Sequence, residues 1–447
     1  MPYLFGLFVI AYLDRVNVSY AALQMKSELS FTDEVLGFGA GVFFWGYFLL
    51  EIPGSILVEK WSARRWIARI MISWGVIAIL TGFVQTKNQF YLLRFLLGLG
   101  EAGFFPGVIV YLSHWFRYQD RAKVIAMFMA AQPIANIIGS PMSGLLLGIN
   151  WLGLSGWRWL FIIEGMPAVI FGVITIFYLT DWPHQAKWLP RDERAWLTSQ
   201  LDRERQAKHS FGLHRILQAF RHREVILLAL TYFFIVSSVY GFTFWLPSII
   251  KKASGSSNLR VSLISAVPYC VGLIAILLVG WSSDRTGERR WHTALPMIAA
   301  SVGLILAVMF QDRLVLSVGM FCLAAAGIYA YCPGFWSLPT SFLSGTAAAA
   351  SIGLINSVGN LGGYAGPHVV GYLSTATGSF FGGVLYLSLS ALVAAGLVLS
   401  IRAAKSDRLQ LLMLPLPLGE GRGEGIAEQC KNSSSLFLSR AAAGEED

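Results

Sequence analysis

The sequence predicts an all-α membrane protein with twelve transmembrane helices arranged as two six-helix repeats, and three observations predict it. Of the 447 residues, 55% are hydrophobic and only 13% are charged, whereas a soluble domain has about 25% charged residues. Twelve apolar runs are long enough to span a bilayer, and one loop motif occurs twice. This composition argues against a soluble enzyme, a disulfide scaffold, a collagen-like chain and a disordered chain.

Each spanning helix needs about 20 mostly apolar residues. The first half supplies six runs, at about 3–23, 36–58, 66–85, 90–116, 122–148 and 157–180. The second half supplies six more, at about 225–250, 260–282, 292–310, 314–336, 345–373 and 379–401. The first run carries two charged residues and no small-residue cleavage site, so we expect a spanning helix there and not a cleaved signal peptide.

These runs divide the chain into four parts. We expect a six-helix bundle at residues 1–180, a linker loop at 181–223, a second bundle at 224–402 and a disordered tail at 403–447. The linker is dense in charges and fits either one or two amphipathic surface helices or a solvated connection. The tail is rich in Pro, Gly and Ser and has low complexity, which is typical of disorder.

Basic residues predict the orientation. The loops after the second, fourth, sixth and eighth spans carry 19 Lys and Arg residues, and the loops on the opposite side carry 6. The positive-inside rule therefore places the first set and both termini in the cytoplasm. We expect a multi-pass protein of the bacterial inner membrane, whose net charge of +9 reflects topology and not a nucleic-acid partner.

One loop motif occurs in both halves. Residues 59–66 read EKWSARRW and residues 284–291 read DRTGERRW, so that corresponding positions are 225 apart. An acidic residue at a helix end can pair with arginines of the adjoining loop, and such a cluster could hold one state of two rocking bundles. The expected gate residues are Glu59, Arg64, Arg65, Asp284, Arg285, Arg289 and Arg290. The alternative is a plain topology signal.

Two duplicated six-helix halves are the layout of one large class of secondary transporter. The repeated loop resembles the signature of the major facilitator superfamily. Residues 11–17 (AYLDRVN), 94–106 (RFLLGLGEAGFFP) and 356–363 (NSVGNLGG) resemble its anion:cation symporter family, the permeases for organic acids such as tartrate, galactonate, glucarate and phthalate. The resemblance covers roughly residues 3–402 and implies a carrier that works by alternating access.

Four charged residues lie deep in the first-half spans, namely Asp14, Arg15, Arg94 and Glu101. A charge at mid-membrane costs at least about 2.5–3.5 kcal/mol, so such residues usually have a function. Arg94 and Glu101 are seven residues apart, which places them on one helix face, about 10 Å apart along the axis. Asp14 and Arg15 diverge by about 100° around their helix. The structural alternative is a pair of salt bridges that holds two helices together.

Arginine presents a planar fork that fits a carboxylate, so we expect Arg15 and Arg94 to bind an organic anion. A carboxyl group in a low-dielectric cavity can gain a proton, which a nearby arginine opposes, so we expect Asp14 and Glu101 to couple transport to protons. By resemblance, further substrate contacts come from Tyr12, Tyr47, Gln132, Trp336, Asn356 and Asn360. Each of these six fits helix packing about equally well.

A GxGxxG pattern at residues 98–103 lies inside a spanning run. A dinucleotide site would need a preceding strand, so we expect close helix packing there instead. We expect points of helix packing or bending at 136–144 and 359–367. We find no ATP-binding P-loop, and we expect no enzyme activity, no cofactor and no metal site.

The sequence thus predicts a monomeric carrier that imports a small organic anion with protons, with a tartrate-like hydroxy acid as the leading substrate. The alternatives are an anion exchanger or an exporter of drugs or metabolites with the same fold. A receptor that binds an acid without moving it fits less well, because it needs no rocking halves.

Overall fold

The computed structural model describes residues 2–117, 120, 121, 124, 128, 131–206, 223–342 and 345–401. Contacts group Met1–Arg402 into one compact unit. The expected tail at 403–447 lies outside the described residues.

The described chain is almost entirely helical. The first half contains α1 (Pro2–Glu28), α2 (Asp33–Lys60), α3 (Ala63–Thr81), α4 (Lys87–Glu101), α5 (Phe104–Trp115), α7 (Ala131–Leu146) and α8 (Gly156–Tyr178). The second half contains α11 (Arg223–Ser254), α12 (Asn258–Thr286), α13 (Trp291–Met309), α14 (Leu314–Phe342), α15 (Gly345–Asn360), α16 (Gly362–Thr377) and α17 (Phe381–Ser400). Between the halves lie the short 3-10 helix η1 (Pro183–Gln185) and α9 (Arg191–Gln206).

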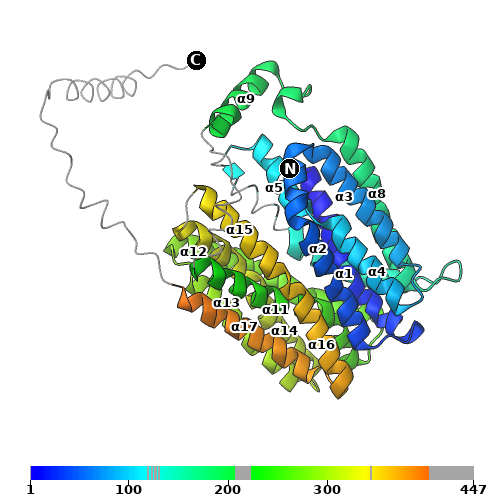
Figure 1. The fold of residues 1–447 in the computed structure, drawn as a ribbon. Coiled ribbons are helices and arrows are strands. Elements are labelled where there is room, and N and C mark those ends of the chain that lie inside the picture. The colour runs from blue at the N-terminus through cyan, green and yellow to red at the C-terminus, as the bar shows by residue number, and fades with distance from the viewer. Residues whose placement is uncertain are drawn as a thin grey trace, which may run out of the picture. The chain divides into compact units, whose positions relative to one another are not determined.

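Nine segments among the described residues are long and apolar enough to cross a membrane. Together with the near absence of β structure in the described ranges, they confirm the predicted all-α membrane fold. The two halves lie side by side in Figure 1, with α1 to α4 and α8 on one side and α11 to α17 on the other.

Two predicted spans are interrupted. The run at 90–116 divides into α4 and α5 because Gly103 has a φ of +84°, a left-handed conformation that glycine adopts without strain. The run at 345–373 divides into α15 and α16 at Leu361. The second break lies inside the 359–367 stretch for which helix bending was expected.

The central loop contains more structure than a bare linker. α9 carries Asp192 and Glu193 in its first turn, where the helix dipole favours acidic side chains. Leu201 of this helix is buried. On the described residues, this part of the chain is therefore helical and partly packed.

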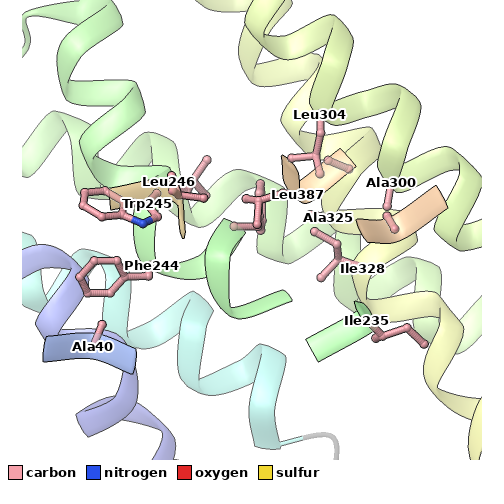
Figure 2. Packing of buried hydrophobic residues seen from close by; sticks show 14 of the residues in the cluster. Ala40, Ile235, Phe244, Trp245, Leu246, Ala300, Leu304, Ala325, Ile328 and Leu387 are labelled. Carbon is pink, nitrogen blue, oxygen red and sulfur yellow. The ribbon is translucent and has the colours of Figure 1, made fainter. Parts of the chain in front are cut away.

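A large apolar core joins the halves. One cluster of buried side chains draws on α11 to α17 and also on α1, α2, α4 and α8. Figure 2 shows a part of it, with Ala40 of α2 pointing toward the ring of Phe244 in α11.

Helix α2 packs closely against α16 at the end of the molecule opposite to α9. A Cβ atom added to Gly37 would lie 2.4 Å from the carbonyl oxygen of Pro367, so the two backbones are nearly in contact. Ser374 donates a hydrogen bond of 2.8 Å to Asp33 Oδ2 at the same end. This packing brings the two halves together, and in the middle of the bundle Arg15 of α1 lies against Tyr240 of α11.

Candidate functional site

Arg15 and Glu101 form a buried ion pair between α1 and α4. Arg15 Nε donates to Glu101 Oε1 at 2.8 Å, and Arg15 Nη2 lies 2.5 Å from the same oxygen. The Glu101 side chain is only 2% exposed and that of Arg15 17%. Glu101 Oε2 is buried without a hydrogen-bond donor among the described residues. One carboxylate oxygen thus takes both contacts while the other has none.

Aromatic rings surround the Arg15 guanidinium. Its central carbon lies 5.4 Å from the ring centres of Tyr12 and Tyr47 and 5.5 Å from that of Phe43, which is within range of cation–π attraction. Arg15 Nη1 donates a 2.9 Å hydrogen bond to the hydroxyl of Tyr240 in α11. The guanidinium is therefore held by groups from both halves of the protein.

Asp14 points the other way, as expected from its position next to Arg15. Trp74 Nε1 donates to Asp14 Oδ2 at 2.6 Å, and Asn17 Nδ2 donates to Oδ1 at 3.0 Å. Asp14 is buried inside the first half, against α3. The two acidic residues predicted to couple to protons therefore occupy different surroundings, one paired with arginine and one hydrogen-bonded to neutral donors.

Arg94 faces the same region as Arg15 but carries fewer partners. Its Nε donates to the carbonyl oxygen of Gly39 at 3.3 Å, and its guanidinium lies 5.2 Å from the ring centre of Phe43. The ring of Phe43 thus contacts both arginines. No carboxylate among the described residues lies within ion-pair distance of Arg94, although Asp14 and Glu101 interact with it electrostatically.

A small cavity of about 50 Å³ lies between the halves next to these residues. A cavity needs about 10–15 Å³ to hold one water, so this one has room for a few water molecules. From the first half it is lined by Tyr12, Arg15, Val16, Ser19, Ala40, Phe43, Phe44, Arg94, Gln132 and Asn136, and from the second by Val239, Tyr240, Thr243, Phe244, Tyr329 and Pro367. Four of the predicted site residues, Tyr12, Arg15, Arg94 and Gln132, are among them.

The predicted residues of the second half lie elsewhere. Trp336 packs edge-on against Tyr232, with ring centres 5.0 Å apart. Asn356 Nδ2 donates a hydrogen bond to Glu51 Oε1 across the two halves, and Asn360 lies beside the same carboxyl group. Of the predicted substrate contacts, Tyr12, Arg15, Arg94 and Gln132 therefore line the cavity. Asn356 and Asn360 lie between α2 and α15, and Trp336 packs against α11.

The sequence analysis named four deep charges in the first half, and the structure adds two buried acids to them. Glu51 is 5% exposed and Glu164 is 4% exposed, and Ser143 donates to Glu164 Oε1 at 3.4 Å. Both lie inside predicted spans, so a scan of every acidic residue in those runs would have found them. The sequence reasoning also missed Tyr240, Tyr329 and Asn136, where Asn136 Nδ2 donates to the Tyr329 hydroxyl at 3.2 Å across the halves.

In the first copy of the loop motif, the acidic partner of Arg64 is Asp181, which lies outside the motif. The backbone nitrogen of Arg64 donates to Asp181 Oδ1 at 2.8 Å, Arg64 Nε lies 3.9 Å from Oδ2, and Ser62 Oγ donates to Oδ2 at 2.7 Å. Arg65 is exposed. The side chain of Glu59, the third gate residue expected in this copy, lies outside the described residues.

In the second copy the acidic partner comes from the motif. Arg289 Nη1 donates to Asp284 Oδ1 at 2.7 Å and to Ser283 Oγ at 2.8 Å. Arg285 lies over the ring of Trp281, and Arg290 Nη2 donates to the carbonyl oxygen of Leu399. Both copies thus tie their loops to helix ends, with different acidic residues.

The GxGxxG pattern serves close packing of helices. A Cβ atom added to Gly98 would lie 2.0 Å from the carbonyl oxygen of Phe43. α4 therefore lies directly against α2, which brings Arg94 and Glu101 next to the rings of Phe43 and Tyr47.

Comparison with known proteins agrees with this architecture. The family model described as Major Facilitator Superfamily matches residues 4–367. A protein of Agrobacterium vitis named as a putative tartrate transporter is 47% identical over 389 residues, which cover 87% of this chain and 89% of that protein. A quinolone resistance transporter of Acinetobacter baumannii is 40% identical over 419 residues, 91% of this chain and 94% of that protein.

Among solved structures, a bacterial homologue of the human lysosomal transporter Spinster, in an inward-facing and unoccupied conformation, superposes with a TM-score of 0.71. It is 18% identical, and the match covers 89% of this chain and 93% of that one. This likeness supports the fold alone.

Proposed function

Because the chain belongs to the Major Facilitator Superfamily, we propose that it moves a small organic anion together with protons across a membrane by alternating access. The family makes the chain a multi-pass membrane transporter and not an enzyme. The substrate, the coupling to protons and the direction of transport are the proposed parts.

One observation carries the proposal, namely the Arg15–Glu101 pair beside a cavity that both halves line. Two opposite charges attract each other, whereas a neutral acid keeps only a hydrogen bond to the guanidinium. A proton on Glu101 therefore weakens its hold on Arg15 and leaves the guanidinium fork free for a carboxylate of the substrate. Proton and anion binding then favour each other, which is the requirement for symport.

The proposed substrate is a tartrate-like hydroxy acid or sugar acid. Arg15 and Arg94 both face the space between the halves, which suits an acid with one or two carboxylates. Hydroxyl and amide groups of Tyr12, Gln132 and Asn136 line the same cavity and can bond substrate hydroxyls. The 47% identity to a protein named as a putative tartrate transporter supports the same class.

In the proposed cycle the anion does not fit the cavity as it stands. The space holds only a few water molecules, so the halves must move apart around the site to admit an organic acid. Asp14, held by Trp74 and Asn17, is proposed as a second site of proton exchange. The contacts of Asp181 and Asp284 with the loop arginines are proposed to hold one state of this movement.

The arrangement in the cell is proposed from the basic loops. We place the chain in the bacterial inner membrane with both termini in the cytoplasm, where it acts as a monomer. Import then uses the inward proton gradient.

A second candidate function is export of a drug or metabolite. It is favoured by the 40% identity to a quinolone resistance transporter and by the aromatic rings of Tyr12, Phe43 and Tyr240 around the cavity. The pair of cavity arginines suits either class, because quinolones also carry a carboxylate, whereas the amides of Gln132 and Asn136 in the lining favour a hydroxy acid.

The decisive experiment is uptake by purified protein in liposomes under an imposed inward proton gradient. The labelled panel is tartrate, galactonate, glucarate, phthalate, 4-hydroxyphenylacetate and a quinolone. Accumulation of one organic acid that depends on the gradient supports symport. Equal uptake without the gradient, but only with a trapped internal anion, supports exchange, and movement of the quinolone alone supports export.

A further inference from the structure

Glu51 is a buried acid that joins the two halves outside the cavity. It lies on α2, one helical turn beyond Tyr47, and is 5% exposed. Asn356 of α15 donates a hydrogen bond to its Oε1 from a position 305 residues away in the chain. Ser357 and Asn360, from the same face of α15, lie beside the carboxyl group.

Among the described residues, the charge of Glu51 is not balanced by a close cation. None of the ion pairs found among the described residues includes it. The charged or titratable groups that interact with it electrostatically are Arg15 of α1, Tyr47 of α2 and Tyr232 of α11. Its second oxygen, Oε2, is buried without a hydrogen-bond donor of good geometry among the described residues.

An unpaired carboxylate buried in a membrane protein is costly in its charged form and inexpensive in its neutral form. The Asn356 amide can donate to either form. The hydrogen bond is charge-assisted when Glu51 is ionised and ordinary when it is protonated. Protonation of Glu51 therefore weakens the link between α2 and α15 without removing either partner.

We propose that Glu51 is a proton-responsive positioning residue that holds the Asn356 amide while ionised and yields it to a carboxylate of the substrate when protonated. This inference rests on the proposed function, because it needs an anionic substrate. The step adds one proton from the aqueous phase to the Glu51 carboxylate and exchanges one N–H···O contact for another. It also removes a negative charge that would repel the incoming anion.

A purely structural role makes a different prediction. If Glu51 serves only to tie α2 to α15, then Glu51→Gln keeps a hydrogen-bond acceptor of the same size and leaves substrate binding and its proton uptake unchanged. The proton-responsive role predicts that the same variant binds substrate but has lost one proton-binding group.

The experiment measures how many protons the purified full-length protein takes up when tartrate binds. Isothermal titration calorimetry in buffers of different ionisation enthalpy gives this number. The variant is Glu51→Gln. The matched control is Glu34→Gln, the same substitution at an exposed position in the first turn of the same helix. A second variant, Asn356→Ala, removes the donor of the hydrogen bond to Glu51 and serves if Glu51→Gln fails to fold.

We expect wild type and Glu34→Gln to take up the same number of protons. Glu51→Gln should take up about one proton fewer per tartrate, so that its affinity changes about tenfold less per pH unit. Asn356→Ala should also take up fewer, because without the amide donor Glu51 is less ionised before tartrate arrives. Equal proton uptake by Glu51→Gln and wild type overturns the inference and leaves the proposed symport intact. Absence of proton uptake in wild type, measured with whichever acid of the liposome panel it binds, overturns the proposed symport and the inference with it, and binding of none of these acids does the same.

Discussion

Arg15 and Tyr240 are 225 residues apart in the chain and 2.9 Å apart in space. The same offset of 225 separates the two copies of the loop motif, so these residues are counterparts in the internal repeat. Two halves of this transporter type are related by an axis along the membrane normal. Residues that lie near such an axis meet their own counterparts, which explains why α1 and α11 contact each other at this point.

Arg15 therefore contacts Glu101 in its own half and Tyr240 in the second half. A movement that separates α1 from α11 must break the bond to Tyr240 and expose the guanidinium. Loading of substrate and movement of the halves therefore involve the same side chain.

Replacement of Arg15 by lysine tests the need for a planar fork. Lysine keeps the positive charge but cannot reproduce the contacts to Glu101 and Tyr240 together. We expect tartrate affinity to fall by at least about tenfold, equivalent to about 1.4 kcal/mol, with the protein still folded. Calorimetry measures the affinity, and Arg313→Lys at an exposed loop position is the control. Unchanged affinity would mean that Arg15 binds substrate by charge alone or not at all.

Replacement of Glu101 by glutamine tests proton coupling. Glutamine imitates the protonated acid, keeps the size of the side chain and frees Arg15 from its ion pair. We expect exchange of labelled for unlabelled tartrate to persist while accumulation driven by a proton gradient is lost. Both are measured in the same liposomes. Gradient-driven accumulation at the wild-type level would exclude Glu101 as a coupling residue.

Replacement of Tyr240 by phenylalanine tests the contact between the halves. The variant loses the hydroxyl that bonds Arg15 but keeps the ring, which packs against Phe44 with centres 4.6 Å apart. A hydrogen bond to a charged group contributes about 1.5–3 kcal/mol, so we expect the rate of tartrate exchange to change by about tenfold or more. Tyr386→Phe is the matched control, because its hydroxyl bonds Ser237 within the second half. Equal rates in all three proteins would contradict a role for this contact.

The sequence was sufficient to predict the fold, because span length, basic loops and the loop repeat each carry a strong signal. It was also sufficient to select Arg15 and Glu101 as charged residues inside spans. It could not show that they pair with each other, since the pairing depends on how α1 and α4 pack. It also could not show that Gly98 lets α4 pack against α2, because the close neighbour of Gly98 is the backbone of Phe43.

The residues that were missed share a cause. Tyr240 and Tyr329 carry no signal in the sequence, because tyrosine is common in spanning helices. A tyrosine of the site differs from one that only packs by the hydrogen-bond partner of its hydroxyl, which the sequence does not show. The repeat offset could have singled out Tyr240 once Arg15 was chosen. Glu51 and Glu164 carry the same signal as Asp14 and Glu101, an acid in an apolar run, and a scan of every acid in the predicted spans identifies them.

Replacement of Gly98 by alanine tests the packing on which the site depends. The added methyl would lie 2.0 Å from the carbonyl oxygen of Phe43, so α4 must shift away from α2. Overpacking of this kind costs about 1–3 kcal/mol. The shift also moves Phe43, whose ring contacts both Arg15 and Arg94. We therefore expect a lower temperature of thermal inactivation in detergent together with weaker tartrate binding. Gly396→Ala is the control, because a methyl there meets no atom within 4 Å. If both variants were as stable and active as wild type, the close approach of α4 to α2 would not be what positions the arginines.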